Sequence, residues 1–475
     1  MPAPRSLHVG LIGAGLGGLA AAIAIARAGC KAASELGEIG AGIQMTPNVS
    51  RLLIKWGVSD IIGDDLVQCK EIRMRRQDGK VVQRTELVPK TVREFGFPWW
   101  VVRRDHLHSG LAEGARRHGV KIEVGARVEG IEYEDQERVR VRTKKGERYE
   151  FDLVIGSDGV KSVVRKTLFP DVKPRAPMNN AAYRTVLPYD YIYEKVPEAR
   201  EVLGNSIDVW GMEKGYVIMY PISGGREWNA VMSHYRDEPV SDVEDNVDMA
   251  EMREYYKDCD PLLSWSSPRK NVVLLGDAAH SMVNHMAQGA ATSMEDGAFL
   301  GRVLGEVVHG VITLEEAIGI YEKARMPRAW IKQQASFVLG GIYMAEDEPR
   351  GKARDESSAA SAQDTSAMAE VKNLHSAQDT SAMAEVKNLQ SKPQISGPDA
   401  NARSWNLWGS PEAVQSIFAY DPEADADFSV LNYLQQNSAW DKETGLSSAL
   451  EEKWTGWFLP KDQVGRIAKS RGTKL

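Results

Sequence analysis

Three glycine-containing stretches, far apart in the sequence, carry residues suited to cofactor chemistry. The first is Gly13-Ala14-Gly15-Leu16-Gly17-Gly18. In this spacing Gly13 permits a tight turn, Gly15 lets the backbone approach a pyrophosphate, and Gly18 permits close packing of the helix that follows. The N-terminus of that helix presents N–H groups and the positive end of its dipole to the phosphates. The stretch therefore predicts a dinucleotide-binding site.

The other two stretches each supply a carboxylate. Asp158 lies in Gly156-Ser157-Asp158-Gly159, and Asp277 lies in Gly276-Asp277-Ala278-Ala279-His280. Asp277 ends a predicted strand, where a carboxylate can accept hydrogen bonds from sugar hydroxyls, although an ordinary helix N-cap is the alternative. Downstream, Gln288-Gly289-Ala290 opens a helix whose N–H groups can stabilise negative charge on a reduced ring. The order of the three stretches indicates a flavin-dependent oxidoreductase.

Strands and helices of an α/β domain must position these residues. The apolar run 6–13 predicts a buried strand, and the Ala-rich run 16–28 predicts a helix that ends at Gly29. Further predicted helices cover 47–56, 104–118, 290–309 and 314–345, and further predicted strands cover 121–127, 138–143, 148–155 and 271–275. We expect a Rossmann-like domain formed by residues 1–175 and 266–345.

A second sheet is predicted within an inserted domain, residues 176–265. Alternating runs at 181–186, 216–220 and 228–235 indicate antiparallel strands, and Ser223-Gly224-Gly225-Arg226 indicates a hairpin turn. Such a sheet can form the wall of a substrate pocket.

The remainder of the chain differs in composition. Residues 346–400 are rich in Ser, Ala, Asp and Glu and contain a tandem repeat, since 361–374 recurs as 376–389. This composition favours a low-complexity insert over a packed domain. We expect the Trp-rich, helical or irregular tail, 401–475, to pack back on the body of the protein.

Composition excludes several classes of function. The chain has 475 residues and a formal net charge of −7, which disfavours nucleic acid or an anionic membrane as the main partner. Three unpaired cysteines, together with His280 and His285 lacking a third ligand, indicate neither a disulfide framework nor a metal site. The uncharged run 9–26 contains the glycine motif, so we expect no membrane span there.

Together these residues resemble the group A FAD-dependent monooxygenases, the para-hydroxybenzoate and salicylate hydroxylase family, and in particular its fungal branch. The resemblance covers about 6–345 and includes the Asp-Gly stretch extended to Arg165. It implies FAD-binding roles for matching positions. These positions are Gly13, Gly15, Gly18, Gly42, Arg104, Asp158, Asp277, Gly289 and Ala290.

The resemblance also implies a reaction. NADH or NADPH reduces FAD, O2 then forms a C4a-hydroperoxyflavin, and this species hydroxylates a small aromatic or polycyclic substrate. By position Arg184 and Tyr216 are the catalytic candidates. Arginine can pair with a phenolate or carboxylate, and tyrosine can exchange a proton. A strand ion pair for Arg184 and a half-buried sheet aromatic for Tyr216 remain the alternatives.

The sequence departs from the family in two places. Cys30-Lys31 runs directly into Ala32-Ala33-Ser34-Glu35, without the β-branched strand that should carry the acid binding the adenosine ribose. Glu35 has about the right spacing, but we expect no strand before it. The passage from Cys259 to Trp265 is also short. These departures predict weak FAD retention.

Two other functions therefore remain open. One is a flavin-deficient, inactive relative, and the other is a flavin epoxidase or rearrangement enzyme of natural-product biosynthesis. We expect a cytoplasmic monomer or homodimer, although the C-terminal Thr473-Lys474-Leu475 is similar to a peroxisomal address.

Overall fold

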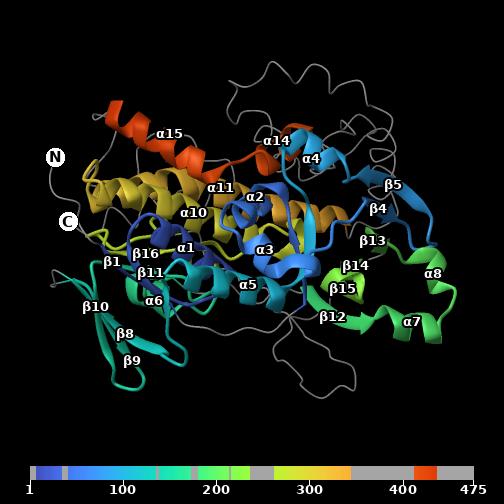
Figure 1. Ribbon diagram of the computed structural model, residues 1–475, viewed down its shortest axis with the longest axis horizontal. Helices are drawn as coiled ribbons and strands as arrows, with labels where there is room; N and C mark the ends of the chain where they lie inside the picture. The colour runs from blue at the N-terminus through green and yellow to red at the C-terminus, as the bar shows by residue number, and fades with distance from the viewer. Residues whose placement is uncertain are drawn as a thin grey trace.

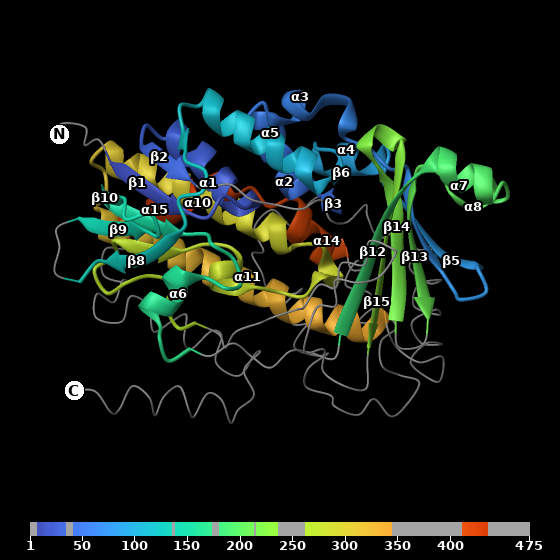
Figure 2. The same ribbon diagram turned by 90° about the horizontal axis from the view of Figure 1, so that it is seen from below.

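A computed structural model describes residues 7–34, 41–134, 138–172, 180–212, 215–235, 262–343 and 411–435. Figure 2 shows a layered arrangement of helices and sheet at one end and an upright, mostly antiparallel sheet at the other. No helix among these residues is long and apolar enough to cross a membrane.

A five-stranded parallel sheet forms the centre of the layered part, in the order β16-β11-β1-β2-β7. Its strands are β1 (His8–Ile12), β2 (Lys31–Ser34), β7 (Lys121–Ile122), β11 (Leu153–Gly156) and β16 (Val272–Leu274). The continuous apolar runs of β11 and β16 are fully buried, as expected for strands covered on both faces. Ile12 pairs with Gly156, and Gly156 with Leu274, so β1, β11 and β16 end at one edge.

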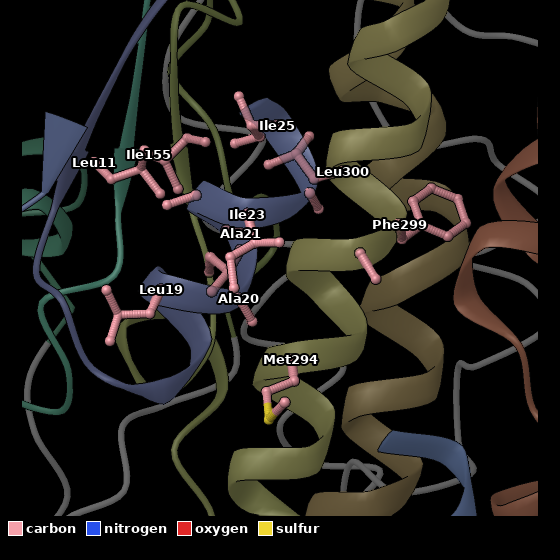
Figure 3. Packing of buried hydrophobic residues seen from close by; sticks show 14 of the residues in the cluster. Leu11, Leu19, Ala20, Ala21, Ile23, Ile25, Ile155, Met294, Phe299 and Leu300 are labelled. Carbon is pink, nitrogen blue, oxygen red and sulfur yellow. The ribbon is translucent and has the colours of Figure 1, made fainter. Parts of the chain in front are cut away.

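The helix after β1 packs closely on a helix from the second half of the chain. Figure 3 shows α1 (Leu16–Arg27) against α10 (Gly289–Val308), with Ala20, Ala21 and Leu300 between them. A Cβ added at Gly297 would lie 2.6 Å from the backbone nitrogen of Ala21. The small residues of both helices therefore permit this close approach.

The prediction that no strand follows the first helix, before Glu35, was wrong. β2 pairs in parallel with β1 through His8↔Lys31, Val9↔Ala32 and Gly10↔Ala33, and it also pairs with β7. Alanine and serine have low intrinsic strand propensity, but neighbouring strands can impose the pairing. Glu35, the first residue after β2, lies outside the described residues.

The upright sheet has six strands, in the order β12-β15-β14-β13-β4-β5. They are β4 (Glu71–Arg75), β5 (Val81–Glu86), β12 (Asn180–Pro188), β13 (Ser206–Met212), β14 (Gly215–Ile222) and β15 (Glu227–Tyr235). The predicted antiparallel strands and the hairpin turn at Ser223–Gly225 are confirmed. The sheet also recruits β4 and β5 from earlier in the chain, because β4 pairs in parallel with β13.

Two ion pairs reinforce the contact between β4 and β13. Asp208 is buried and accepts hydrogen bonds from Arg73 at 2.6 Å and Arg75 at 2.7 Å. Because the two guanidinium groups compensate the buried carboxylate, Asp208 can lie between the paired strands β4 and β13.

Smaller elements complete the fold. The predicted strand 148–155 is two strands in different sheets, since β10 (Arg148–Phe151) pairs with β9 (Val139–Thr143), which pairs with β8 (Val128–Glu132). β3 (Gly42–Met45) pairs with β6 (Trp100–Arg103). The short helices are α2 (Pro47–Lys55), α3 (Val58–Ile62), α4 (Lys90–Phe95), α6 (Val163–Leu168), α7 (Tyr189–Lys195), α8 (Ala199–Val202) and α9 (Asp277–His280), with 3₁₀ turns at Gly63–Asp65, Ser223–Gly225 and Asn284–Met286.

Long helices cover the parallel sheet, and the C-terminal helices lie on them. The predicted helices at 104–118, 290–309 and 314–345 correspond to α5 (Arg104–Arg117), α10 and α11 (Leu314–Tyr343). α14 (Pro411–Phe418) and α15 (Pro422–Gln435) pack on this body, with α15 beside α10 and α11 (Figure 1). This confirms the expected packing for that part of the tail, whereas the 346–400 insert with its repeat lies outside the described residues.

Candidate functional site

The glycine-rich turn after β1 has the geometry of a phosphate cradle. Gly13 has φ +101°, and a Cβ added there would lie 2.5 Å from the carbonyl oxygen of Ser157. A Cβ on Gly18 would lie 2.6 Å from the Ser157 Oγ. Gly15, by contrast, caps α1 and faces open space, with nothing within 4 Å of an added Cβ. The turn thus packs on the Asp-Gly stretch at two glycines and leaves open space at the third.

Asp158 uses its carboxylate to organise the turn after β11. It accepts hydrogen bonds from the Ser162 hydroxyl at 2.5 Å and from the Val163 backbone at 2.6 Å, at the start of α6. Burial raises the pKa of Asp158, while these hydrogen bonds act in the opposite direction. Arg165 then donates to the backbone oxygen of Ala278 at 2.9 Å, which ties this turn to the third stretch.

Asp277 is the one exposed residue in the run 271–280. It is the first residue of α9, and Gly276, with φ +63°, is the N-cap, so the alternative of an ordinary Asp277 N-cap is wrong. The buried His280 anchors the other end of α9 through a 2.5 Å contact with Asp296. The carboxylate therefore stands at the strand edge beside the glycine cradle, where it can accept hydrogen bonds from sugar hydroxyls.

The start of α10 is held by a buried amide. Gln288 is the N-cap residue, and its side chain donates to the Thr46 hydroxyl at 3.0 Å and accepts from Lys332 at 3.2 Å. Gly289 and Ala290 are half-buried in the first turn, whose N–H groups have no partner within the helix. This end of α10 can stabilise negative charge on a ring placed against it.

One strand pair joins the two parts of the molecule. The Gly42 N–H donates to the Asn229 side chain on β15 at 2.8 Å, and a Cβ on Gly42 would lie 2.6 Å from the Tyr220 ring. The Arg104 N–H donates to the Ala41 oxygen at 2.8 Å, so Arg104 starts α5 beside this strand. Gly42 and Arg104 are therefore neighbours between the cradle and the upright sheet.

Arg184 and Tyr216 share one face of the upright sheet. Arg184 on β12 pairs with Val231, whereas Tyr216 on β14 pairs with Ser233, two residues along the same strand β15. Directly paired residues point to the same face, and so do residues two apart. Val231 packs with Val283, which places this face against the loop before α10.

Tyr216 also contacts that loop directly. Its hydroxyl lies 2.8 Å from Nδ1 of His285, and both side chains are buried. Burial lowers the pKa of His285 to about 4, so the imidazole is neutral near pH 7. In its Nε2–H tautomer the ring accepts the Tyr216 hydrogen at Nδ1, which leaves the phenolic oxygen able to accept another hydrogen bond.

The sequence missed this role of His285. It treated His280 and His285 only as a possible metal pair, but the structure gives them different partners, Asp296 and Tyr216. Among the described ranges no group of three or more His, Cys, Asp or Glu side chains could hold a metal ion. The available signal was the position of His285 shortly before Gln288, in the loop that leads into the helix starting at Gly289. Asn229 gave no comparable signal.

Comparison with known proteins identifies a family and relatives with similar sequences. The family described as "FAD binding domain" matches residues 6–254 and 263–336. A FAD-dependent monooxygenase, OpS4, of Beauveria bassiana is 31% identical over 388 residues, covering 75% of this chain and 90% of that protein. A 3-hydroxybenzoate 6-hydroxylase of Aquipseudomonas alcaligenes is 32% identical over 368 residues, covering 71% and 89%.

A solved structure shares the fold. The salicylate hydroxylase substrate complex superposes with a TM-score of 0.64 at 19% identity, covering 89% of this chain and 98% of that one. The layered part and the upright sheet therefore recur together in that structure.

Proposed function

The chain belongs to the family of FAD-dependent monooxygenases, and from that premise we propose that it hydroxylates a phenolic or salicylate-like aromatic ring. The residues present fit the cofactor. Gly15 would leave room for the pyrophosphate, Asp277 would offer an exposed carboxylate to the ribityl chain, and the N-terminus of α10 would stabilise charge on the ring. When bound, FAD supplies hydride acceptance from NADH or NADPH and activation of O2.

The single observation that carries the aromatic substrate is the shared face of Arg184 and Tyr216. A guanidinium binds a carboxylate or phenolate through paired N–H donors. With His285 in its Nε2–H tautomer, the Tyr216 hydroxyl donates to Nδ1 and its oxygen can accept a hydrogen bond from a substrate hydroxyl. Arg184 would thus bind the anionic end of the ring, and the hydrogen bond to Tyr216 would increase the electron density at the carbon to be oxidised.

The relatives support this substrate class. One is named for hydroxylation of 3-hydroxybenzoate, which carries both a carboxylate and a phenol. The open alternative of an inactive relative rested in part on a missing second strand, and β2 is present. We propose a cytoplasmic enzyme that acts as a monomer or homodimer.

The test is a substrate screen with purified protein, added FAD and either NADH or NADPH. Phenolic acids, matched benzoates without the hydroxyl, and matched phenols without the carboxylate form the panel. We expect nicotinamide oxidation and a product 16 mass units heavier only with ring-hydroxylated members. Nicotinamide oxidation that releases only hydrogen peroxide for every compound would count against the proposal, and an epoxide or rearranged product would support the natural-product alternative.

A further inference from the structure

A cluster of fully buried charges joins α10 to α11. Glu295, Asp296 and Arg325 are each 0% exposed. Arg325 donates to Asp296 at 2.8 Å and to Glu295 at 2.9 Å. Glu295 also accepts hydrogen bonds from Arg328 at 2.8 Å and from Lys332 at 2.9 Å. Such a cluster is stable only if each buried charge keeps its partners.

The cluster reaches the cofactor motifs at two points. Asp296 accepts hydrogen bonds from His280 at 2.5 Å and from the Gly276 N–H at 3.3 Å, so it contacts both sides of Asp277. Lys332 donates to Gln288 at 3.2 Å, at the start of α10. A displacement of these charges would therefore move the exposed carboxylate of Asp277 and the start of α10, the two groups that would contact FAD.

The cluster is completed by a residue from beyond the 346–400 insert. The Tyr420 hydroxyl accepts from Arg325 at 2.7 Å and donates to Asp425 at 2.7 Å. Its ring lies 3.6 Å from the Arg328 guanidinium, within the range of a cation–π contact. Arg328 in turn donates to the backbone oxygen of Ser416 at 3.1 Å.

The charges beside Tyr420 explain why an electron-rich ring suits this position. Arg325 and Arg328 supply two cations, and Lys332 adds a third when it is protonated, whereas the carboxylates are those of Glu295, Asp296 and Asp425. Burial and the neighbouring Arg328 lower the pKa of Lys332 to about 7, although Glu295 acts in the opposite direction. The ring face of Tyr420 adds negative potential against Arg328 without adding a buried ion.

We propose that Tyr420 is a positioning residue for FAD binding, which acts through Arg325 and Asp296 on the Gly276–Asp277 turn. The segment 411–435 then completes the cofactor site from outside the FAD-contacting motifs. This inference rests on FAD binding alone and is independent of the substrate proposed above.

The test compares two substitutions at Tyr420, which lies between α14 and α15, with a matched control in α15. Y420F keeps the ring and removes the hydroxyl, whereas Y420L removes both. D427N removes a peripheral ion pair, that of Asp427 with the half-exposed Arg302 at 2.5 Å, and leaves the buried cluster unchanged. FAD affinity of the full-length apoprotein is measured by quenching of flavin fluorescence, and thermal unfolding of the same apoprotein is measured in parallel.

We expect the FAD Kd to rise about tenfold in Y420F, which leaves an Arg325 donor without its acceptor, and further in Y420L. D427N should bind FAD as the wild type does. If Y420L does not fold, Y420F decides the question. An unchanged FAD Kd in folded Y420F, with only a lower apoprotein Tm, would overturn the proposal, as would an equal loss of affinity in D427N.

Discussion

The Tyr216 hydroxyl and His285 Nδ1 lie 2.8 Å apart, although the two residues come from different parts of the fold. The tyrosine belongs to the upright sheet, and the histidine belongs to the loop that precedes α10. In the Nε2–H tautomer of His285, the tyrosine hydroxyl is the donor of this contact. Substitutions at the two residues can therefore be tested for their effects on the free energy of unfolding and on turnover.

His285 should make stability depend on pH below neutrality. Its pKa is lowered to about 4 in the folded protein by burial. The unfolded chain binds the proton near pH 6.5, so the contribution to the free energy of unfolding is fully present above pH 6.5 and is lost as the pH falls to about 4. The upper limit is about 3 kcal/mol. Urea unfolding of wild type and H285Q at several pH values measures it, and a constant difference across this window would contradict the expectation.

Tyr216 should affect turnover more than substrate binding. In Y216F the substrate hydroxyl loses its acceptor, so kcat should fall about a hundredfold for phenolic substrates while KM changes little. Steady-state kinetics with substrates of different phenol pKa provides the check. The loss should shrink as the phenol becomes more acidic, because such substrates ionise without help. A loss that is equal for all phenols would assign Tyr216 a packing role.

Arg184 should affect substrate binding more than turnover. R184A should raise KM about tenfold or more for carboxylate-bearing substrates, and R184K should recover part of that loss because it restores the charge without the paired donors. The matched substrates without a carboxylate are the control. If KM rises equally for those compounds, the anion is not the group that Arg184 binds.

Gly15 should tolerate alanine in the apoprotein but not in the FAD complex. An added Cβ meets nothing within 4 Å, yet it lies where a pyrophosphate must approach the backbone. G15A should therefore keep the apoprotein Tm and raise the FAD Kd about tenfold or more. Gly204 has an equally open surrounding far along the chain, so G204A is the control for a simple Gly-to-Ala effect. Equal FAD affinity in G15A and G204A would show that the pyrophosphate does not approach the backbone at Gly15.

Glu35 tests whether the short second strand still carries a ribose anchor. With β2 ending at Ser34, Glu35 follows the strand as the acid of a dinucleotide site does. E35Q should weaken FAD binding about tenfold, since a hydrogen bond to a charged group is lost. The visible spectrum of purified wild type and E35Q, with and without added FAD, gives the answer. If the wild-type protein does not retain FAD, the prediction of weak FAD retention made from the sequence would hold.

Local patterns predicted those parts of the site that are encoded locally. A continuous apolar strand followed by glycines, or by Gly-Asp, is enough to place the Gly13, Asp158 and Asp277 turns, because parallel strands must end at a shared edge. The family match, the relatives and the sheet topology confirm the family assignment, the α/β fold and FAD as the cofactor that these patterns predicted. The FAD-contact and catalytic residues remain proposals.

Long-range pairing explains what the sequence could not provide. β2 lacks β-branched residues and forms because β1 and β7 pair with it on either side. β4 joins the upright sheet through a parallel pairing with a strand more than a hundred residues later. The contact between Tyr216 and His285 depends on that same assembly of distant segments, and no spacing along the chain encodes it.

The joint between Gly42 and Asn229 has a consequence for how such an enzyme can diversify. At this joint the part with the parallel sheet contributes a backbone N–H, whereas the upright sheet contributes the side chain of Asn229. Side chains of the upright sheet that contact neither Gly42 nor the loop before α10 can therefore be exchanged without altering the glycine turns. A change of substrate in such an enzyme would then leave the family's cofactor chemistry intact.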